Sequence, residues 1–319
     1  MLDESIFRCV KLVVVGNINR DLKSAPIPPG DYLFRDGETT LAGVYETIGG
    51  GGANSAAIAA RLGADVSFVG QVGDDALGRQ LEQALTRHGI RCHLHKAANL
   101  ATGSTLNLVF DTGQRHFLSC HPNNAALSFD TLDLSALETA RHLHRADIWF
   151  SNAMLFGGNE KLFQAARAAD VATSIDLNWD PQWGHAGAEE IQRRKEAVRA
   201  VLPLVDLAHG NARELCAFAD APDLPDALAR LVDWGAGAVV VHLGGQGAGY
   251  FSRGEMFIEP PAPIARQLMA TGTGDVLSVC LMLLHHLADI AAPAKLRLAN
   301  RIVAEFIDGR RRLIPELNV

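Results

Sequence analysis

The sequence predicts an α/β fold, with a central, mostly parallel β-sheet flanked by helices and a small β-sheet beside it. Short runs of β-branched residues alternate with segments of helical length along most of the 319 residues. This alternation is typical of βαβ units. Two irregular segments, at about 17–48 and 102–121, interrupt it. Apolar residues make up 48% of the chain, which is enough for a sizeable core.

The first half of the chain opens with two strand–helix pairs. Residues 11–17 (KLVVVGN) are an apolar run of strand length, and residues 51–63 begin and end on glycine, as many helices do. Residues 65–73 and 75–89 repeat the pair. Segment 102–121 then reads as two strands around the turn DTGQ. We therefore expect the small β-sheet to be an insertion into the alternating pattern.

The second half continues the alternation up to residue 245. The expected strands are 146–153, 171–178, 205–211 and 237–245. The expected helices are 159–170, 187–202, 212–219 and 224–235. A last apolar helix begins near Asp275. We expect His142 and His144 late in a helix and at the surface. No linker rich in Ser, Pro or charge separates the insertion from the rest, so residues 1–319 are predicted to form one domain.

Charge and cysteine content exclude several classes of protein. The formal net charge is −7 and basic residues are not clustered, which argues against a nucleic-acid partner. Five scattered cysteines without a CxxC motif fit a reducing, cytoplasmic compartment. The apolar run that follows Asp275 is interrupted by His285, His286 and Asp289, so no membrane span is expected.

Two groups of residues at the start of the chain are candidates for ligand binding. Asn19 and Asp21 follow the first strand, where α/β sheets place ligand contacts, and their side chains suit hydroxyl groups. The run Gly49–Gly52 enters the first helix, with Asn54 in its first turn. Glycines such as Gly50 let a ligand approach the backbone closely. Ordinary polar turns are the alternative for both groups.

The segment ATGTGD combines an anion site with a carboxylate. Gly272, Thr273 and Gly274 precede a helix whose first amides and dipole favour an anion. Asp275 is either a helix cap or a general base beside that anion site. Phosphoryl transfer to a hydroxyl needs both groups.

The segment NARE suggests a magnesium site. Asn211 and Glu214 lie three residues apart on one helix face. Mg²⁺ typically uses one or two carboxylates together with phosphates and water. A solvated helix start is the simpler explanation.

The order of these motifs resembles the ribokinase-like (PfkB) family of carbohydrate kinases over nearly the whole chain. The resemblance is carried by VVVGNINRDL, GGGGANSAAIAARLGADVSFVGQVGDDALG, GNARE, VVVHLGGQGAGYF and ATGTGDVLSV. It implies ATP-dependent phosphorylation of a sugar hydroxyl, with Mg²⁺ as the cofactor. It also implies a ribokinase-like sheet flanked by helices and a β-sheet lid formed by about 17–48 and 102–121.

The resemblance also implies roles for individual residues. Asp275 would be the catalytic base, and the amides of Gly272, Thr273 and Gly274 would form the anion hole. The sugar would contact Asn19, Asp21, Gly50 and Asn54. The nucleotide would lie near Asn211, His242, Gly244, Gly247 and Asn300, and the metal near Glu214.

The chain also departs from the family pattern. Relatives usually read D-T-T-G-A-G-D, whereas this chain has Met269 and Ala270 at the first two positions. Loss of the first aspartate argues against activation by a monovalent cation. Asp180 stands where relatives often carry arginine, so we expect weaker attraction for phosphates. A nucleoside kinase and a non-catalytic sugar or nucleotide sensor remain alternatives, and pairing of lids between two copies is an open expectation.

Overall fold

The structure, a computed structural model, describes residues 2–268, 272–314 and 317 of the chain. The strands of its main sheet are β1 (Lys11–Val15), β4 (Asp65–Gly73), β5 (Arg91–Ala97), β8 (His142–Arg145), β9 (Ala172–Asp176), β10 (Leu207–Asn211), β11 (Val239–His242), β12 (Ala248–Ser252) and β13 (Glu255–Glu259). Their order is β13-β12-β11-β10-β9-β8-β1-β4-β5. All pairings from β5 to β11 are parallel, and β12 and β13 add an antiparallel hairpin at one edge. The mostly parallel sheet is thus confirmed.

Helices cover both faces of this sheet. They are α1 (Gly51–Arg61), α2 (Ala76–Arg87), α3 (Pro122–Ala125), α4 (Asn159–Ala168), α5 (Ala188–Arg199), α6 (Ala212–Ala219), α7 (Leu224–Asp233), α8 (Thr273–Leu283) and α9 (Ala292–Ile307). One buried cluster joins the sheet to α1, α2, α8 and α9. A second cluster joins its other face to α4, α5, α6 and α7. None of the described helices has both the length and the apolar character needed to cross a bilayer.

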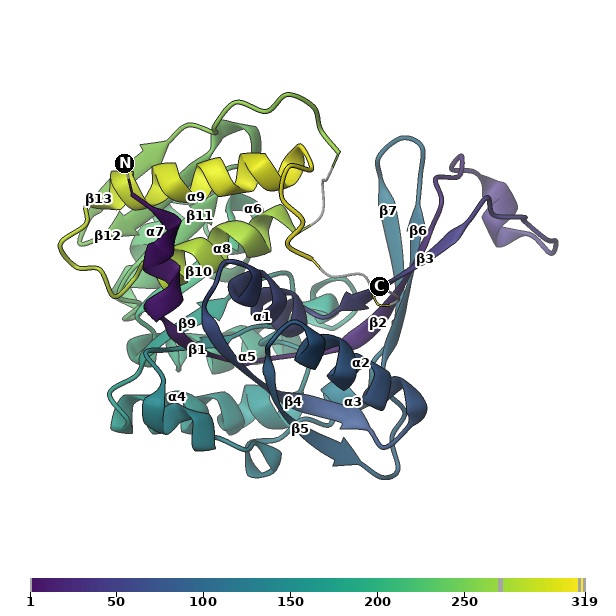
Figure 1. The fold of residues 1–319 in the computed structure, drawn as a ribbon, viewed down its shortest axis with the longest axis horizontal. Helices are drawn as coiled ribbons and strands as arrows, with labels where there is room; N and C mark the ends of the chain where they lie inside the picture. The colour runs from purple at the N-terminus through teal and green to yellow at the C-terminus, as the bar shows by residue number, and fades with distance from the viewer. Residues whose placement is uncertain (1, 269–271, 315–316, 318–319) are drawn as a thin grey trace.

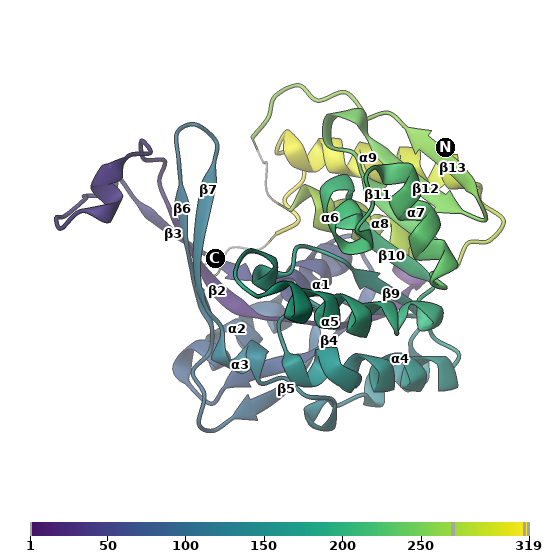
Figure 2. The same ribbon diagram turned by 180° about the vertical axis from the view of Figure 1, so that it is seen from behind.

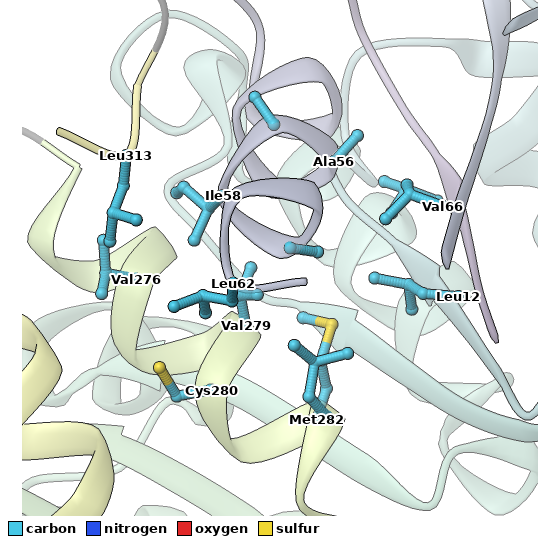
Figure 3. Packing of buried hydrophobic residues seen from close by; sticks show 14 of the residues in the cluster. Leu12, Ala56, Ile58, Leu62, Val66, Val276, Val279, Cys280, Met282 and Leu313 are labelled. Carbon is cyan, nitrogen blue, oxygen red and sulfur yellow. The ribbon is translucent and has the colours of Figure 1, made fainter. Parts of the chain in front are cut away.

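Helices α1 and α8 pack against each other, α1 over β1 and β4 and α8 over β8, β10 and β11 (Figure 3). Ile58 of α1 and Val279 of α8 are fully buried in this contact. Both helices begin at the carboxyl edge of the sheet, each directly after a glycine with positive φ, Gly50 at 93° and Gly272 at 83°. Because apolar packing holds the two helices together, their N-termini have fixed positions at this edge.

A second sheet of four strands extends away from the main body (Figures 1 and 2). It contains β2 (Asn19–Ser24), β3 (Val44–Gly49), β6 (Ser104–Val109) and β7 (Arg115–Cys120), in the order β3-β2-β6-β7. The pair β2–β6 is parallel, and the other two pairs are antiparallel. We call this sheet the lid. Its strands fall within the two irregular segments of the sequence, except that β3 ends one residue later, at Gly49.

The strand predicted at 146–153 is wrong. The structure places the strand at His142–Arg145, and a turn follows in which Asp147 has a φ of 55°. The apolar residues Ile148 and Trp149 are buried in that turn. Their burial explains why the segment reads as a strand from its apolar character alone.

His142 and His144 are likewise not surface residues in a helix. They lie on β8 with side chains that are 2% and 0% exposed. His142 Nε2 and His144 Nδ1 both lie 2.8 Å from Ser174 Oγ on β9. His209 on β10 is also fully buried, and its ring lies against that of His144. Because a hydroxyl partner lies within hydrogen-bond reach of the two β8 rings, a polar sequence can form a buried strand.

We expect these histidines to make the fold sensitive to acid. Burial lowers the pKa of His144 to about 3, and it lowers the pKa values of His142 and His209 well below the usual value. Below about pH 6.5 the unfolded chain therefore binds more protons than the folded one. The free energy of unfolding should fall by up to about 1.4 kcal/mol per pH unit for each such residue.

Urea denaturation of wild type and of His209→Leu between pH 7 and pH 5 tests this expectation. The variant should lose less stability as the pH falls, because it lacks one of the buried rings that gain a proton on unfolding. Neither nitrogen of His209 has a hydrogen-bond partner among the described protein atoms, so leucine removes no such bond. His116→Leu, at an exposed position on β7, is the control and should keep the wild-type slope. Equal slopes for all three proteins would contradict the assignment.

Candidate active site

Polar residues gather where the parallel strands of the main sheet end. They are Asn17 after β1, Asp147 after β8, Asp176 at the end of β9, Asn211 at the end of β10 and His242 at the end of β11. Ligands of open α/β sheets bind beyond this edge. Two cavities open here, one beneath the lid and one beside α8.

The lid cavity has a volume of about 870 Å³. It is lined by Asn17, Asn19, Asp21, Gly50, Thr105, Phe117, Ser119, His121, Ala125, Asp147, Trp149, Phe150, Asn152, Asp180, Pro181, Gln182, His185 and Arg194. Three of the four predicted sugar contacts, Asn19, Asp21 and Gly50, are among them. The fourth, Asn54, is not, although its Oδ1 atom is buried without a partner among the described protein atoms.

Asn19 and Asp21 lie on one face of β2, which the strand period of two places toward the cavity. Asn19 Nδ2 donates a hydrogen bond of 2.8 Å to Asp21 Oδ1. The Oδ1 atoms of Asn17 and Asn19 are buried and have no partner among the described protein atoms. Burial raises the pKa of Asp21. Unpartnered buried acceptors are costly, so this end of the cavity is suited to bind hydroxyl donors.

Glycine is required at the entry to α1 because the backbone passes very close to the segment after β1. A Cβ on Gly50 would lie 2.4 Å from the carbonyl oxygen of Asn17, and one on Gly52 would lie 2.6 Å from Gly16 Cα. The amides of Gly51 and Gly52 donate to the carboxylate of Asp147, at 3.1 and 2.8 Å. The glycine run thus binds a carboxylate of the chain itself, which the sequence analysis did not foresee.

The α8 cavity has a volume of about 590 Å³. Its lining includes Thr273 and Gly274 together with the predicted nucleotide contacts His242, Gly244, Gly247 and Asn300. Asn300 of α9 donates to the carbonyl oxygens of Glu259 and Pro260, at 3.0 and 2.8 Å. Its amide therefore holds the end of β13 against α9 as well as lining the cavity.

His242 connects the α8 cavity to the helix itself. Its Nε2 lies 3.0 Å from Ser278 Oγ on α8. A Cβ on Gly274 would lie 3.0 Å from His242 Nδ1. Burial lowers the pKa of His242 to about 4, so the ring is neutral at physiological pH. Its contacts keep the first turn of α8 close to the end of β11.

Asp275 lies in the first turn of α8. Burial, together with the charges of Asp147 and Glu214, raises its pKa to about 7. Asp147 lines the lid cavity, whereas Thr273 and Gly274, the neighbours of Asp275, line the α8 cavity. The first amides of α8 have no partner within the helix. A carboxylate and unpartnered backbone amides therefore lie together at the start of α8.

Glu214 and Asn211 form a capping box at the start of α6. Asn211 Oδ1 accepts from the Glu214 amide, and Glu214 Oε2 accepts from the Asn211 amide, both at 2.9 Å. The helix start is thus capped within the protein. Burial raises the pKa of the Glu214 carboxylate. Neither residue lines the two cavities described above.

The acidic residues at this edge fit a divalent cation. The charges of Asp147 and Glu214 act on both Asp176 and Asp275, and burial followed by the charge of Asp275 raises the pKa of Asp176 well above its usual value. No three metal-binding side chains form a cage among the described residues. Mg²⁺ does not need one, because it binds one or two carboxylates and completes its shell with phosphates and water.

Asp180 does not leave the cavity with an unpaired charge, because it has a partner that the sequence analysis did not foresee. The side chain is fully buried, and its carboxylate accepts from Arg194 of α5 at 2.7 and 3.1 Å. Arg194 also donates to the carbonyl oxygen of Trp149 and to Asn152. The pair holds the turn after β9 against α5.

Asp147 and Asp176 are site residues that sequence reasoning missed. Asp176 ends a correctly predicted strand, so its position at the carboxyl edge was available as a signal. Asp147 was hidden by the wrong strand assignment. Met269 and Ala270, where the family pattern fails, lie outside the described residues.

Comparison with known proteins supports the same reading. Residues 10–283 match the model of the pfkB family carbohydrate kinases. A ribokinase of Arabidopsis thaliana is 27% identical over 277 residues, which cover 84% of this chain and 68% of the relative.

Two solved structures share the fold. Arabidopsis thaliana ribokinase complexed with ribose and ATP has a TM-score of 0.76 at 22% identity, covering 97% of this chain and 96% of that one. Fructokinase from Xylella fastidiosa with bound ATP has a TM-score of 0.78 at 20% identity, covering 95% and 92%. At these identities the likeness establishes the architecture of sheet and lid.

Proposed function

Because the chain belongs to the pfkB family of carbohydrate kinases, which are phosphotransferases with an alcohol group as acceptor, we propose that it transfers the γ-phosphoryl group of ATP to a hydroxyl of a carbohydrate. The observation that carries this proposal is the position of Asp275. It lies in the first turn of α8, directly after Thr273 and Gly274, which line the α8 cavity, and the charge of Asp147, which lines the polar cavity beneath the lid, acts on it. Residues 1–319 act as one kinase domain in this proposal.

Each cavity would bind one substrate. Asn19, Asp21 and Gly50 would orient the sugar from the lid cavity, and Asn54 would approach it from α1. In the α8 cavity, His242, Gly244, Gly247 and Asn300 would border the nucleotide. The acceptor hydroxyl would then lie near Asp275, with the γ-phosphoryl group on its far side, at the start of α8.

In the reaction, Asp275 accepts the proton of the acceptor hydroxyl while that oxygen forms a bond to the γ-phosphorus. The bond between the γ-phosphorus and the bridging oxygen breaks, and ADP leaves. The amides of Gly272, Thr273 and Gly274 stabilise the charge on the moving phosphoryl group. Glu214, with Asn211 nearby, would hold the magnesium ion, which neutralises phosphate charge. Closure of the lid would exclude water and so limit hydrolysis of ATP.

An assay of ADP release tests the function directly. The purified chain with Mg²⁺ and ATP should release ADP when pentoses, hexoses or nucleosides are added one at a time, and at least one of them should be phosphorylated. Release of ADP that no added acceptor stimulates would contradict the proposal. Binding of ATP and a sugar without any turnover would instead support a sensor.

A further inference from the structure

The two ends of the lid cavity differ in chemistry. One end holds Asn17, Asn19 and Asp21, and the two asparagines are each 2% exposed with unpartnered Oδ1 atoms. The other end holds aromatic side chains, among them Phe117 and Phe150. A cavity of about 870 Å³ lies in the upper part of the range for drug-sized ligands, about 300–1,000 Å³. It therefore has room for a further group beside a sugar ring.

The aromatic end is built from two different elements. Phe117 lies on β7, on the same face as Ser119, and is 51% exposed over the cavity. Phe150 follows β8, and its ring lies 6.2 Å from that of His121. Burial lowers the pKa of His121, so this ring is also uncharged near neutral pH. Aromatic rings in such positions favour offset or edge contacts with another flat ring.

A short chain of polar contacts joins the two ends. Asn19 Nδ2 lies 3.4 Å from Thr105 Oγ1, and Thr105 Oγ1 lies 2.8 Å from His121 Nε2. Thr105 thus links Asn19 to His121, whose ring lies against that of Phe150. A group attached directly to the sugar ring would reach the aromatic end.

The charge of the lining excludes an acidic substrate. Asp21, Asp147 and Asp180 carry carboxylates, and Arg194 is the sole arginine or lysine among the lining residues. Its guanidinium is already bound to Asp180, Asn152 and a carbonyl oxygen. A phosphate or carboxylate on the substrate would face an excess of negative charge without a free cation to pair with.

We propose that the acceptor substrate is a nucleoside: a pentose that carries an uncharged, flat heteroaromatic group, stacked between the lid and the turn after β8 on Phe117 and Phe150. The pentose hydroxyls bind the asparagines and Asp21, and the flat group fills the aromatic end. This inference rests on the proposed kinase function, because it names the substrate of that same site. The bonds made and broken in the transfer are unchanged.

Steady-state kinetics with Mg²⁺ and ATP test the proposal by comparing inosine and adenosine with free ribose. At least one nucleoside should have a kcat/KM about tenfold or more above that of ribose, since an aromatic pair contributes on that order. Phe117→Ala should lower the value for the nucleoside about tenfold and change that for ribose less than twofold. Leu118→Ala is the matched control, since Leu118 is 52% exposed on the opposite face of β7. Phe150→Leu repeats the test on another element.

Calorimetric titration without ATP measures binding of the acceptor substrate separately from phosphoryl transfer. Tighter binding of a nucleoside than of ribose, lost in Phe117→Ala, supports the inference even if no phosphorylation occurs. A lack of phosphorylation would contradict only the kinase function. Ribose or fructose binding and reacting as well as the best nucleoside overturns the inference while leaving the kinase function intact. An equal effect of Phe117→Ala and Leu118→Ala overturns it as well.

Discussion

Asp275→Asn should lower kcat by about 10²–10⁴-fold, which is the usual contribution of a general base. The amide keeps the shape of the carboxylate but does not accept a proton from the acceptor hydroxyl. Burial and the charges of Asp147 and Glu214 raise the pKa of Asp275 to about 7, so the wild-type carboxylate is a stronger base than an exposed one. The change should leave the KM for ATP within a few-fold, because the amides of Thr273 and Gly274 remain.

The pH dependence of the wild-type kcat/KM is a second test of the role of Asp275. Since the base acts in its deprotonated form, kcat/KM should fall by about tenfold per pH unit below pH 7. Asp289→Asn is the control, because this exposed carboxylate lies beyond the other end of α8 and should leave kcat unchanged. Retention of most of the wild-type rate by Asp275→Asn would show that another group takes the proton.

The regular part of the fold could be predicted because its signals are local. Runs such as 65–73 and 171–178 are apolar over the length of a strand, and the helices between them begin and end on glycine or capping residues. Strand β8 gave no such signal. His142 and His144 look polar in sequence, and only Ser174, about 30 positions away, shows that they can be buried.

The site divides in the same way. Asn19, Asp21 and Asp275 stand at strand or helix ends that the sequence marks, so their positions could be predicted. Asp147 receives three backbone amides from residues 95 to 130 positions away. No residue close to Asp147 in the sequence indicates these hydrogen bonds. The partner of Asp180 was missed for the same reason, since Arg194 looks like any basic residue of an exposed helix.

Arg194→Met should reduce the free energy of unfolding by about 3–5 kcal/mol, the usual effect of breaking a buried ion pair by removing one partner. The Arg194 side chain is 4% exposed and that of Asp180 is 0% exposed. Methionine fills part of the space but leaves the Asp180 carboxylate without its two guanidinium hydrogen bonds. Urea denaturation followed by circular dichroism measures the loss.

The neighbouring arginine provides a matched control for this prediction. Arg193 on the same helix pairs with Glu190, but its side chain is 57% exposed. Arg193→Met should therefore change stability by about 1 kcal/mol or less. Replacing both partners, in Asp180→Leu with Arg194→Met, should recover part of the lost stability, because no buried charge is then left unpaired. Equal losses for Arg193→Met and Arg194→Met would mean that the Asp180–Arg194 pair does not stabilise the wall of the lid cavity.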